Sequence, residues 1–428
     1  MAELTPTYGS VLRLDEAAEG AVPSAWGRPS VRLTVLFMAL ACFGLVVTTS
    51  SAGSGDFLPA MAKRAALTGL GLCAFLAGAR LNYTCWRRHQ LGILVLALAG
   101  LTAVFIPGLG VVRNGARRWM DVGLPIGLQP SEFAKIALCI WVAAYCERNL
   151  TRLSSFVRGF LAPLSVVGLA CLLILLEPDF GTAVLAGVVC TIVLLVMGTR
   201  VVFILLAAAA SLPLMHQLVF GVPYRLERVL TFMDPWADAQ GTGYQLIQSL
   251  IAIGSGGTTG LGLGASHQKE AFLPGVVNDF AFSVVAEELG FVGSVALIVL
   301  LALVLWECLK VVQRSRCPFG FGLALGLAIL LGIQAAAHVA VVSGCVPTKG
   351  LSLPFISAGG SSLLASMLAA GILVSIARAE EDPDSHDVRP WQEDMPFYER
   401  LATGLLRATA RAVVRTVRNS FPQGEDAH

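Results

Sequence analysis

Asp279 stands where a long polar stretch ends and a long apolar run, which starts with Phe280-Ala281-Phe282, begins. A carboxylate at such a boundary is partly desolvated, and burial raises its pKa above the ordinary value of about 3.9 and makes it a better base. Aspartate is also favoured at the N-cap of a helix, so a purely structural role is the alternative. We treat Asp279 as a candidate general base.

Several arginines lie together in the segment Arg113-Asn114-Gly115-Ala116-Arg117-Arg118-Trp119. Planar guanidinium groups match phosphate oxygens in a bidentate geometry, so Arg117 and Arg118 are candidates for binding a phosphate-containing substrate. The alternative is that these side chains snorkel to a membrane surface, with Trp119 as an interfacial anchor. The sequence leaves both interpretations open.

Glu132 and Lys135 form a further charged group in Gln129-Pro130-Ser131-Glu132-Phe133-Ala134-Lys135. Pro130 and Ser131 suit a helix start, and residues three apart share one helical face, so the two charges can pair. A charged pair entering a bilayer is costly, so it should face protein or a water-filled cavity. Whether this pair holds helices together or touches a substrate stays open.

Two other polar segments are rich in turn-forming residues. Asp179 lies in Glu177-Pro178-Asp179-Phe180-Gly181-Thr182, where it either belongs to a turn or serves as an auxiliary acid. The run from Pro347 to Ser362 contains two prolines, paired glycines and the cation Lys349. It predicts a re-entrant irregular segment, which a membrane tolerates only where protein or water satisfies the backbone.

Long apolar runs must position all of these groups. Of the 428 residues, 56% are hydrophobic and only 14% are charged, against about 25% charged in an ordinary soluble domain. Runs of about 18 residues or more are long enough, as helices, to cross a hydrocarbon core of roughly 30 Å. We predict an all-α polytopic membrane protein of about ten transmembrane helices, near residues 33–51, 65–81, 91–107, 132–147, 159–176, 180–198, 201–219, 281–311, 320–343 and 360–377.

The basic residues beside these runs indicate the orientation. They collect in alternate connections and in the C-terminal tail, so those sides and both termini should face the cytoplasm. The large loop between spans seven and eight, residues 221–279, then faces outward, and its 244–253 stretch has the spacing of an amphipathic helix on the membrane surface. We divide the chain into a cytoplasmic tail, 1–32, a transmembrane domain, 33–378, and a cytoplasmic tail with a basic amphipathic segment, 379–428.

Six ordered blocks of the chain are specific enough to identify a likeness: GARRWMDVG, QPSEFAKIAL, EPDFGTA, YRLERVLTFMDPWADAQGTGYQLIQSLIAIGSGG, FAFSVVAEELG and PTKGLSLPFISAGGSS. They resemble the SEDS family of bacterial cell-wall synthesis, and its division members more than its elongation members. The resemblance covers about residues 33–378. The chain departs from the family where members commonly read PEAHTD, since it has Pro274-Gly275-Val276-Val277-Asn278-Asp279, and where Ala358 replaces a tyrosine.

The resemblance implies an activity and a set of site residues. The family polymerises lipid II, an undecaprenyl-pyrophosphate-linked disaccharide-pentapeptide, into glycan strands of peptidoglycan. By this likeness Asp279 is the catalytic aspartate, the family's Glu and Lys of the fourth span fall on Glu132 and Lys135, and its basic loop position falls on Arg118. Asp179, from its own sequence context, remains a further auxiliary candidate. The expected substrate-binding residues are Arg117, Arg118, Lys269, Lys349, Gln245, Gln248, Ser361 and Ser362.

These residues predict a single inverting displacement in which Asp279 deprotonates the acceptor hydroxyl and the arginines hold the pyrophosphate. No motif demands a metal, although Mg²⁺ or Mn²⁺ could share the pyrophosphate charge. The resemblance implies a class B penicillin-binding protein (FtsI-like transpeptidase) and other division proteins as partners, with no nucleic acid, in the bacterial inner membrane at the division septum. The alternatives are a lipid II flippase, an elongation polymerase and a non-catalytic division scaffold.

Overall fold

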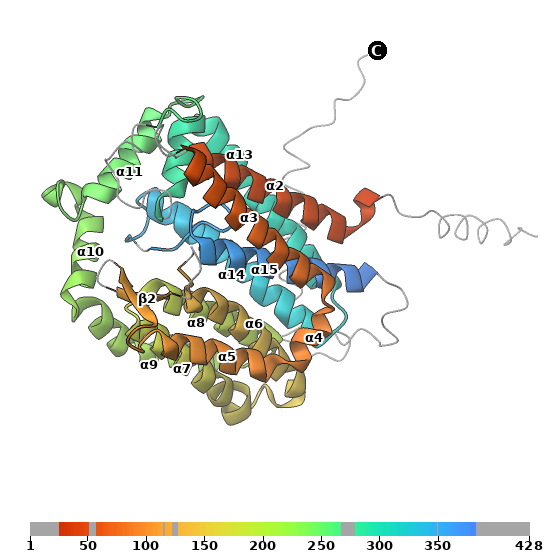
Figure 1. Ribbon diagram of the computed structural model, residues 1–428. Coiled ribbons are helices and arrows are strands. Elements are labelled where there is room, and N and C mark those ends of the chain that lie inside the picture. Colours follow the sequence, from red (N-terminus) through yellow and green to blue (C-terminus); the bar gives the residue numbers. More distant parts are fainter. Residues whose placement is uncertain are drawn as a thin grey trace, which may run out of the picture.

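Every apolar run predicted as a span is helical in the computed structural model, which describes residues 25–50, 57–113, 116–121, 127–266, 279–348 and 350–381. The bundle in Figure 1 is built from these long helices. They are α2 (Pro29–Ser50), α3 (Phe57–Arg80), α5 (Gln90–Ala103), α6 (Pro130–Arg148), α7 (Ala162–Leu176), α8 (Phe180–Met197), α9 (Val201–Phe220), α13 (Ala281–Arg314), α14 (Pro318–Val342) and α15 (Gly360–Glu381).

Shorter elements complete the chain. At one end of the bundle lie α4 (Tyr83–Arg88) and short turns of helix at Ala25–Gly27 and Leu150–Arg152, and a π-helical turn, Phe156–Leu161, precedes α7. At the other end lie β1 (Gly110–Arg113), β2 (Ala116–Met120), α10 (Pro223–Met233), η4 (Pro235–Asp238) and α11 (Tyr244–Ser255). The fold is therefore all-α apart from one small hairpin, which the sequence pattern did not predict.

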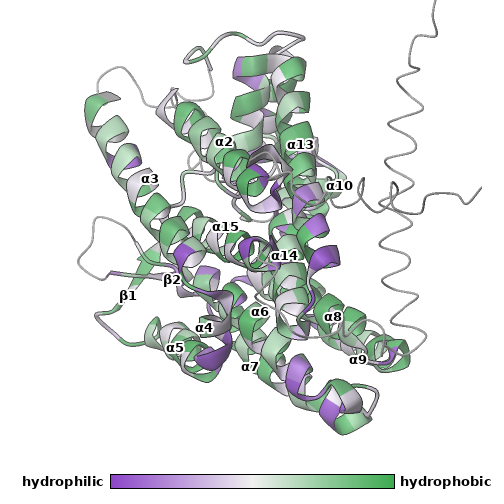
Figure 2. Cartoon of the chain, turned by 90° about the vertical axis from the view of Figure 1, so that its right-hand side faces the viewer, coloured by the Kyte–Doolittle hydropathy of each residue, from purple (hydrophilic) through white to green (hydrophobic). Residues whose placement is uncertain are grey.

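Seven of the described helical segments are long and apolar enough to cross a membrane. These are α2, Phe156–Leu176, α8, α9, α13, α14 and α15. The helix α5 has only 14 residues, and α3 and α6 carry charged side chains that lower their apolar character. Figure 2 shows that hydrophobic residues predominate along these helices. Many large apolar side chains of the bundle are exposed, as expected where lipid is the solvent. The total of about ten spans stays a prediction.

The interior of the bundle is formed by α6, α14 and α15, whereas α9 has no buried residue at all. Small residues let the central helices approach closely. A β-carbon on Gly78 of α3 would lie 2.8 Å from the backbone oxygen of Leu368, and one on Gly371 of α15 would clash with the backbone of Phe75. Close packing through glycine is the usual way in which helices associate in lipid.

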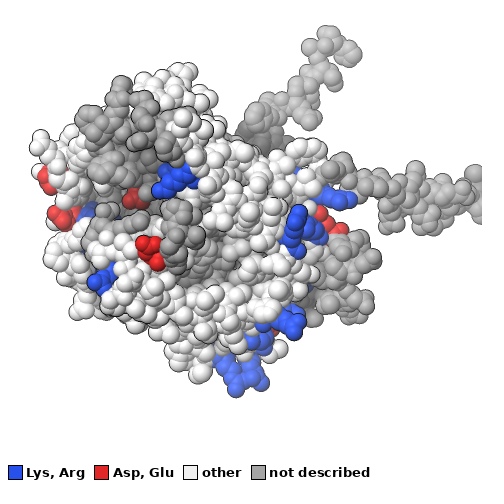
Figure 3. All heavy atoms as spheres, viewed as in Figure 1, with Lys and Arg blue, Asp and Glu red and all other residues white. Residues whose placement is uncertain are grey.

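The two ends of the described chain meet at one end of the bundle. Ser30 of α2 donates from its backbone nitrogen to Glu381 of α15 at 2.7 Å. At the same end Arg32 pairs with Glu307, and the α4 residue Arg87 pairs with Glu147. Basic groups gather there in Figure 3. The basic connections that the sequence analysis places on one side of the membrane therefore lie at one end of the bundle. That this end is cytoplasmic remains a prediction. Residues 1–24 and 382–428, including the basic C-terminal segment, lie outside the described residues.

The helix α11 confirms the predicted helix at 244–253 but not its predicted position on the membrane surface. Its residues Leu246, Ile247 and Ala252 are buried because they pack against α13 and α14, and Ser249 donates to the carbonyl oxygen of Val342 at 2.9 Å. Only Leu250 and Ile251 of this apolar set remain exposed. An amphipathic pattern cannot by itself distinguish a lipid surface from a protein surface.

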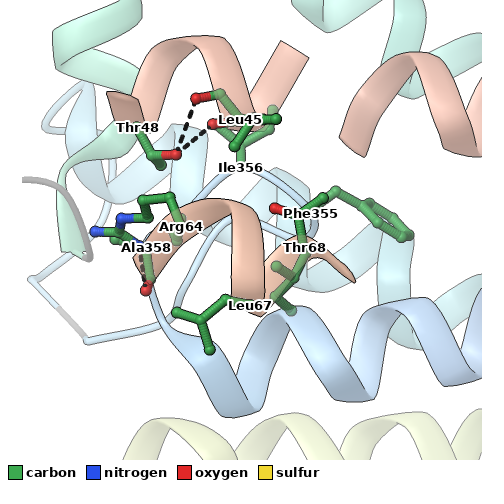
Figure 4. Close-up of a pocket in the computed structure, with 11 residues that line it drawn as sticks. Leu45, Thr48, Arg64, Leu67, Thr68, Phe355, Ile356 and Ala358 are labelled. Carbon is green, nitrogen blue, oxygen red and sulfur yellow. Dashed lines mark hydrogen bonds between the residues drawn. The ribbon is translucent and has the colours of Figure 1, made fainter. Parts of the chain in front are cut away.

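The segment after Gly350 is irregular and buried, as the re-entrant prediction requires. Its backbone oxygens are satisfied by side chains of neighbouring helices: His338 bonds to Leu351 at 2.7 Å, Gln334 donates to Ser352 at 2.9 Å and Arg64 donates to Ala358 at 2.6 Å. Figure 4 shows Arg64 of α3 reaching this segment beside a small cavity of about 10 Å³. Side chains therefore supply the partners that lipid cannot.

Candidate active site

Asp279 lies directly before Phe280, the N-cap residue of α13, and within electrostatic reach of Arg228 on α10. It is therefore not the N-cap itself, and the structural alternative considered for it is wrong. Its carboxylate faces the backbone of Gly350, where a β-carbon would lie 3.6 Å from Oδ2. The loop-to-helix junction and the buried irregular segment thus meet at this carboxylate.

The electrostatic surroundings of Asp279 combine desolvation with nearby cations. Its side chain is open to solvent on one side, yet the protein packed around the other sides raises its pKa above the ordinary value of 3.8, chiefly by desolvation. Arg228 and Arg118 lower this pKa, and Asp179 raises it. The arrangement is that of a carboxylate base placed next to groups that attract an anion.

Arg228 on α10 is a site residue that the sequence analysis missed. Its Nη1 donates to the carbonyl oxygen of Thr348 at 2.9 Å, and its guanidinium lies 4.5 Å from the ring centroid of Tyr224 and bonds to that hydroxyl. Arg225, one turn earlier, turns to the carbonyl of Leu218 instead. Arg225 and Arg228 are three residues apart, a spacing that places both on one face of a helix. The sequence analysis predicts a loop here, so this spacing did not point to Arg228.

Arg118 takes its place through an irregularity in the hairpin. In the β1–β2 register Val111 faces Trp119 and Val112 faces Arg117, so Arg118 is the extra residue of a β-bulge. Bulges commonly re-aim a side chain beside a functional site. Arg118 donates from Nε to the carbonyl oxygen of Glu177 at 3.1 Å and from Nη2 to that of Pro178, whereas Arg117 is exposed.

Glu177 is a second residue that the sequence analysis did not assign to the site. Its side chain is fully buried, and within the described part of the chain both carboxylate oxygens have no hydrogen-bond partner. Desolvation first and Asp179 second raise the pKa of Glu177 to about 8, against the opposing effect of Arg118. The sequence did not predict this buried acid beside Arg118, because the proline and glycine that follow Glu177 are typical of a turn.

The predicted auxiliary residues lie in tight internal contacts. Asp179 caps α8 by accepting from the backbone nitrogen of Thr182 at 3.2 Å and from its hydroxyl at 2.9 Å. Lys135 pairs with Glu132 at 3.0 Å and donates to Gln334 at 2.9 Å, both in the buried interior. Since Gln334 also holds Ser352, this pair connects α6 with α14 and with the re-entrant segment.

The four other predicted substrate-binding residues that the structure describes lie on α11 and α15. Ser361 is buried, accepts from the backbone nitrogen of Gln129 and donates to the carbonyl of Gly127, each at 2.9 Å. Ser362 is also buried and shares a hydrogen bond with the Ser352 hydroxyl. On α11, Gln245 is exposed and Gln248 is half-buried, and Lys269 and Lys349 lie outside the described residues. A substrate contact for any of these six residues stays a prediction.

A bound metal ion would need a cluster of ligand side chains. In the described ranges no group of three or more His, Cys, Asp or Glu side chains is placed to hold a metal ion. Asp179 acts on Asp279 through space, while its own carboxylate accepts from Thr182.

Comparisons with known proteins agree with this architecture. The family model described as cell cycle protein, FtsW/RodA/SpoVE, matches residues 31–382. The chain is 39% identical to the probable peptidoglycan glycosyltransferase FtsW of Geobacter sulfurreducens, over 81% of this chain and 94% of that protein. It is 35% identical to the stage V sporulation protein E of Bacillus subtilis, over 82% of this chain and 97% of that protein.

The chain is also similar to solved structures, among them that of a peptidoglycan synthase complex. That structure describes the structural coordination of polymerization and crosslinking by a peptidoglycan synthase complex, and one of its chains matches with a TM-score of 0.69 and 27% identity. The match covers 81% of this chain and 97% of that one. On the matching family model, the relatives and the shared fold, this chain belongs to the FtsW/RodA/SpoVE family.

Proposed function

We propose that this protein, a peptidoglycan glycosyltransferase by family, polymerises lipid II with Asp279 as the general base. The observation that carries the proposal is the position of the Asp279 carboxylate beside Gly350 and within electrostatic reach of Arg228 and Arg118. A base next to an anion-binding group is what glycan polymerisation requires, because a hydroxyl must lose a proton while a pyrophosphate departs.

In the proposed reaction Asp279 accepts the proton of the acceptor's GlcNAc 4-hydroxyl. The freed oxygen attacks the anomeric carbon of the donor, the bond from that carbon to the pyrophosphate oxygen breaks, and the configuration inverts. A single carboxylate suffices because the pyrophosphate is already an anion when it leaves. Arg118 and Arg228 stabilise the developing charge, and Arg117 adds to the positive potential at the surface.

The building of this site on membrane helices suits a lipid-linked substrate. The polyprenyl chains would stay in hydrocarbon, against the exposed apolar faces of helices such as α9, while the sugars react at the outer end of the bundle. A divalent cation, Mg²⁺ or Mn²⁺, would be held by pyrophosphate oxygens and would share their charge, since these ions prefer oxygen ligands.

The setting of the reaction is proposed from the relatives. The match to FtsW supports a role in septal wall synthesis during cell division, in the bacterial inner membrane. The basic residues in alternate connections support a cytoplasmic location of both termini. The match to a peptidoglycan synthase complex that coordinates polymerization and crosslinking supports a class B penicillin-binding protein as the crosslinking partner.

The test is polymerisation of lipid II by the purified protein, alone and with a co-purified class B penicillin-binding protein. Glycan strands from the wild type support the proposal. Transport of lipid II across vesicle membranes without any glycan product would instead support a flippase.

A further inference from the structure

Glu177 is buried in a way that disfavours its charged form. The side chain is 0% exposed, and neither carboxylate oxygen has a hydrogen-bond partner among the described residues. Leaving an ionised carboxylate buried without hydrogen bonds is far more costly than leaving the neutral acid there. The conformation observed is therefore one that suits protonated Glu177.

The same residue positions Arg118. The guanidinium donates to the carbonyl oxygens of Glu177 and Pro178 through Nε and Nη2, which leaves Nη1 without a partner in the described part of the site. A guanidinium has five N–H donors, so this edge can still receive an anion. Arg118 also acts on both Asp279 and Glu177 through space.

Ionisation of Glu177 would change this arrangement. A carboxylate forms a stronger, charge-assisted hydrogen bond with a guanidinium than a neutral acid does. Among the described residues, Arg118 of β2 is the cation that acts on Glu177, whereas Asp179, the N-cap residue of α8, repels the negative form. Arg225 of α10 lies over the ring of Phe180, on the same turn. An ionised Glu177 would thus compete with a bound anion for Arg118.

We propose that Glu177 is a positioning residue that must carry its proton for Arg118 to hold the pyrophosphate of the substrate. When Glu177 loses this proton, its carboxylate takes the free edge of the guanidinium and pyrophosphate binding weakens. The inference deepens the proposed function and rests on it for the identity of the ligand. Because the pKa of Glu177 lies at about 8, the weakening falls between neutral and mildly alkaline pH.

The experiment measures binding of inorganic pyrophosphate to the full-length protein by calorimetry at pH 7 and pH 9. Since most of Glu177 is ionised at pH 9, the wild type should bind about tenfold more weakly there. Glu177→Gln keeps a neutral side chain of the same size, so its affinity should change much less. Glu227→Gln, which alters an exposed glutamate on α10, is the matched control and should behave like the wild type.

Two results would overturn the inference: equal weakening in Glu177→Gln and the wild type, or no weakening in the wild type. If Glu177→Gln does not fold, infrared spectroscopy of the wild type decides instead, since the band of a protonated carboxyl group must vanish between pH 7 and pH 9. Pyrophosphate binding tests the role of Glu177 without any catalysis, and lipid II polymerisation at pH 7 tests the proposed function. A failure of the Glu177 inference can therefore be told from a failure of the proposed function.

Discussion

The carboxylate of Asp279 and the backbone of Gly350 face each other, and a β-carbon on Gly350 would lie 3.6 Å from Oδ2. This is an ordinary contact distance, so Gly350→Ala should fold. The added methyl group would exclude water from the carboxylate and raise the pKa of Asp279 further above 3.8. We expect the acid limb of the pH–rate profile to move to higher pH, with a rate about threefold to tenfold lower on that limb.

The control for this variant is Gly359→Ala, in the same irregular segment. Its β-carbon would meet only Ser362, also at 3.6 Å, and not Asp279. A Gly350→Ala profile that superimposes on that of Gly359→Ala would show that the carboxylate is not the group that titrates.

Arg228 should matter for the reaction more than Arg225, although both lie on α10. Arg228→Ala removes a cation that lowers the pKa of Asp279 and that we place at the pyrophosphate. Loss of one such donor costs about a hundredfold in turnover. Arg225→Ala removes a bond to Leu218 and a contact with Phe180, so it should lower the melting temperature with a smaller effect on turnover. Similar turnover in the two variants would argue against the assignment of Arg228.

The buried pair of Glu132 and Lys135 should stabilise the fold more than the pair that half-exposed Lys310 forms with Glu307, which also pairs with Arg32. Both pairs are three residues apart, but Lys135 is 2% exposed and Lys310 is 35% exposed. Lys135→Met leaves a buried charge unpaired, which costs about 3–5 kcal/mol, whereas Lys310→Met should cost about 1 kcal/mol or less. Denaturant unfolding in detergent measures both, and equal losses would contradict the structural role of the buried pair.

Glu177 should make stability depend on pH. The folded protein holds this proton up to about pH 8, whereas the unfolded chain releases it near 4.5. Between these values the folded state binds more protons, so the unfolding free energy should fall by about 1.4 kcal/mol per pH unit from this group. Melting curves from pH 5 to pH 8 should therefore be flatter for Glu177→Gln than for the wild type. If stability fell with pH equally steeply in the wild type and in Glu177→Gln, Glu177 would not be the group that holds the proton.

The helices were predictable from sequence because a bilayer requires long apolar segments, and every predicted run is helical in the structure. The pairing of Glu132 with Lys135 and the burial of the segment after Gly350 followed from the cost of charge and irregular backbone in lipid. The position of Arg118 did not follow, since it depends on a β-bulge in a two-stranded hairpin. Arg228 and Glu177 were missed because their importance arises from contacts with residues far away in the sequence.

The most direct test of the account is the rate of lipid II polymerisation by Asp279→Asn. Asparagine keeps the size of the side chain at the Gly350 contact but cannot accept the proton, and loss of a general base costs about a hundredfold to ten-thousandfold. We therefore expect at least about a hundredfold loss of glycan-strand synthesis, with an unchanged melting temperature. Synthesis of glycan strands by Asp279→Asn at the wild-type rate would contradict the account.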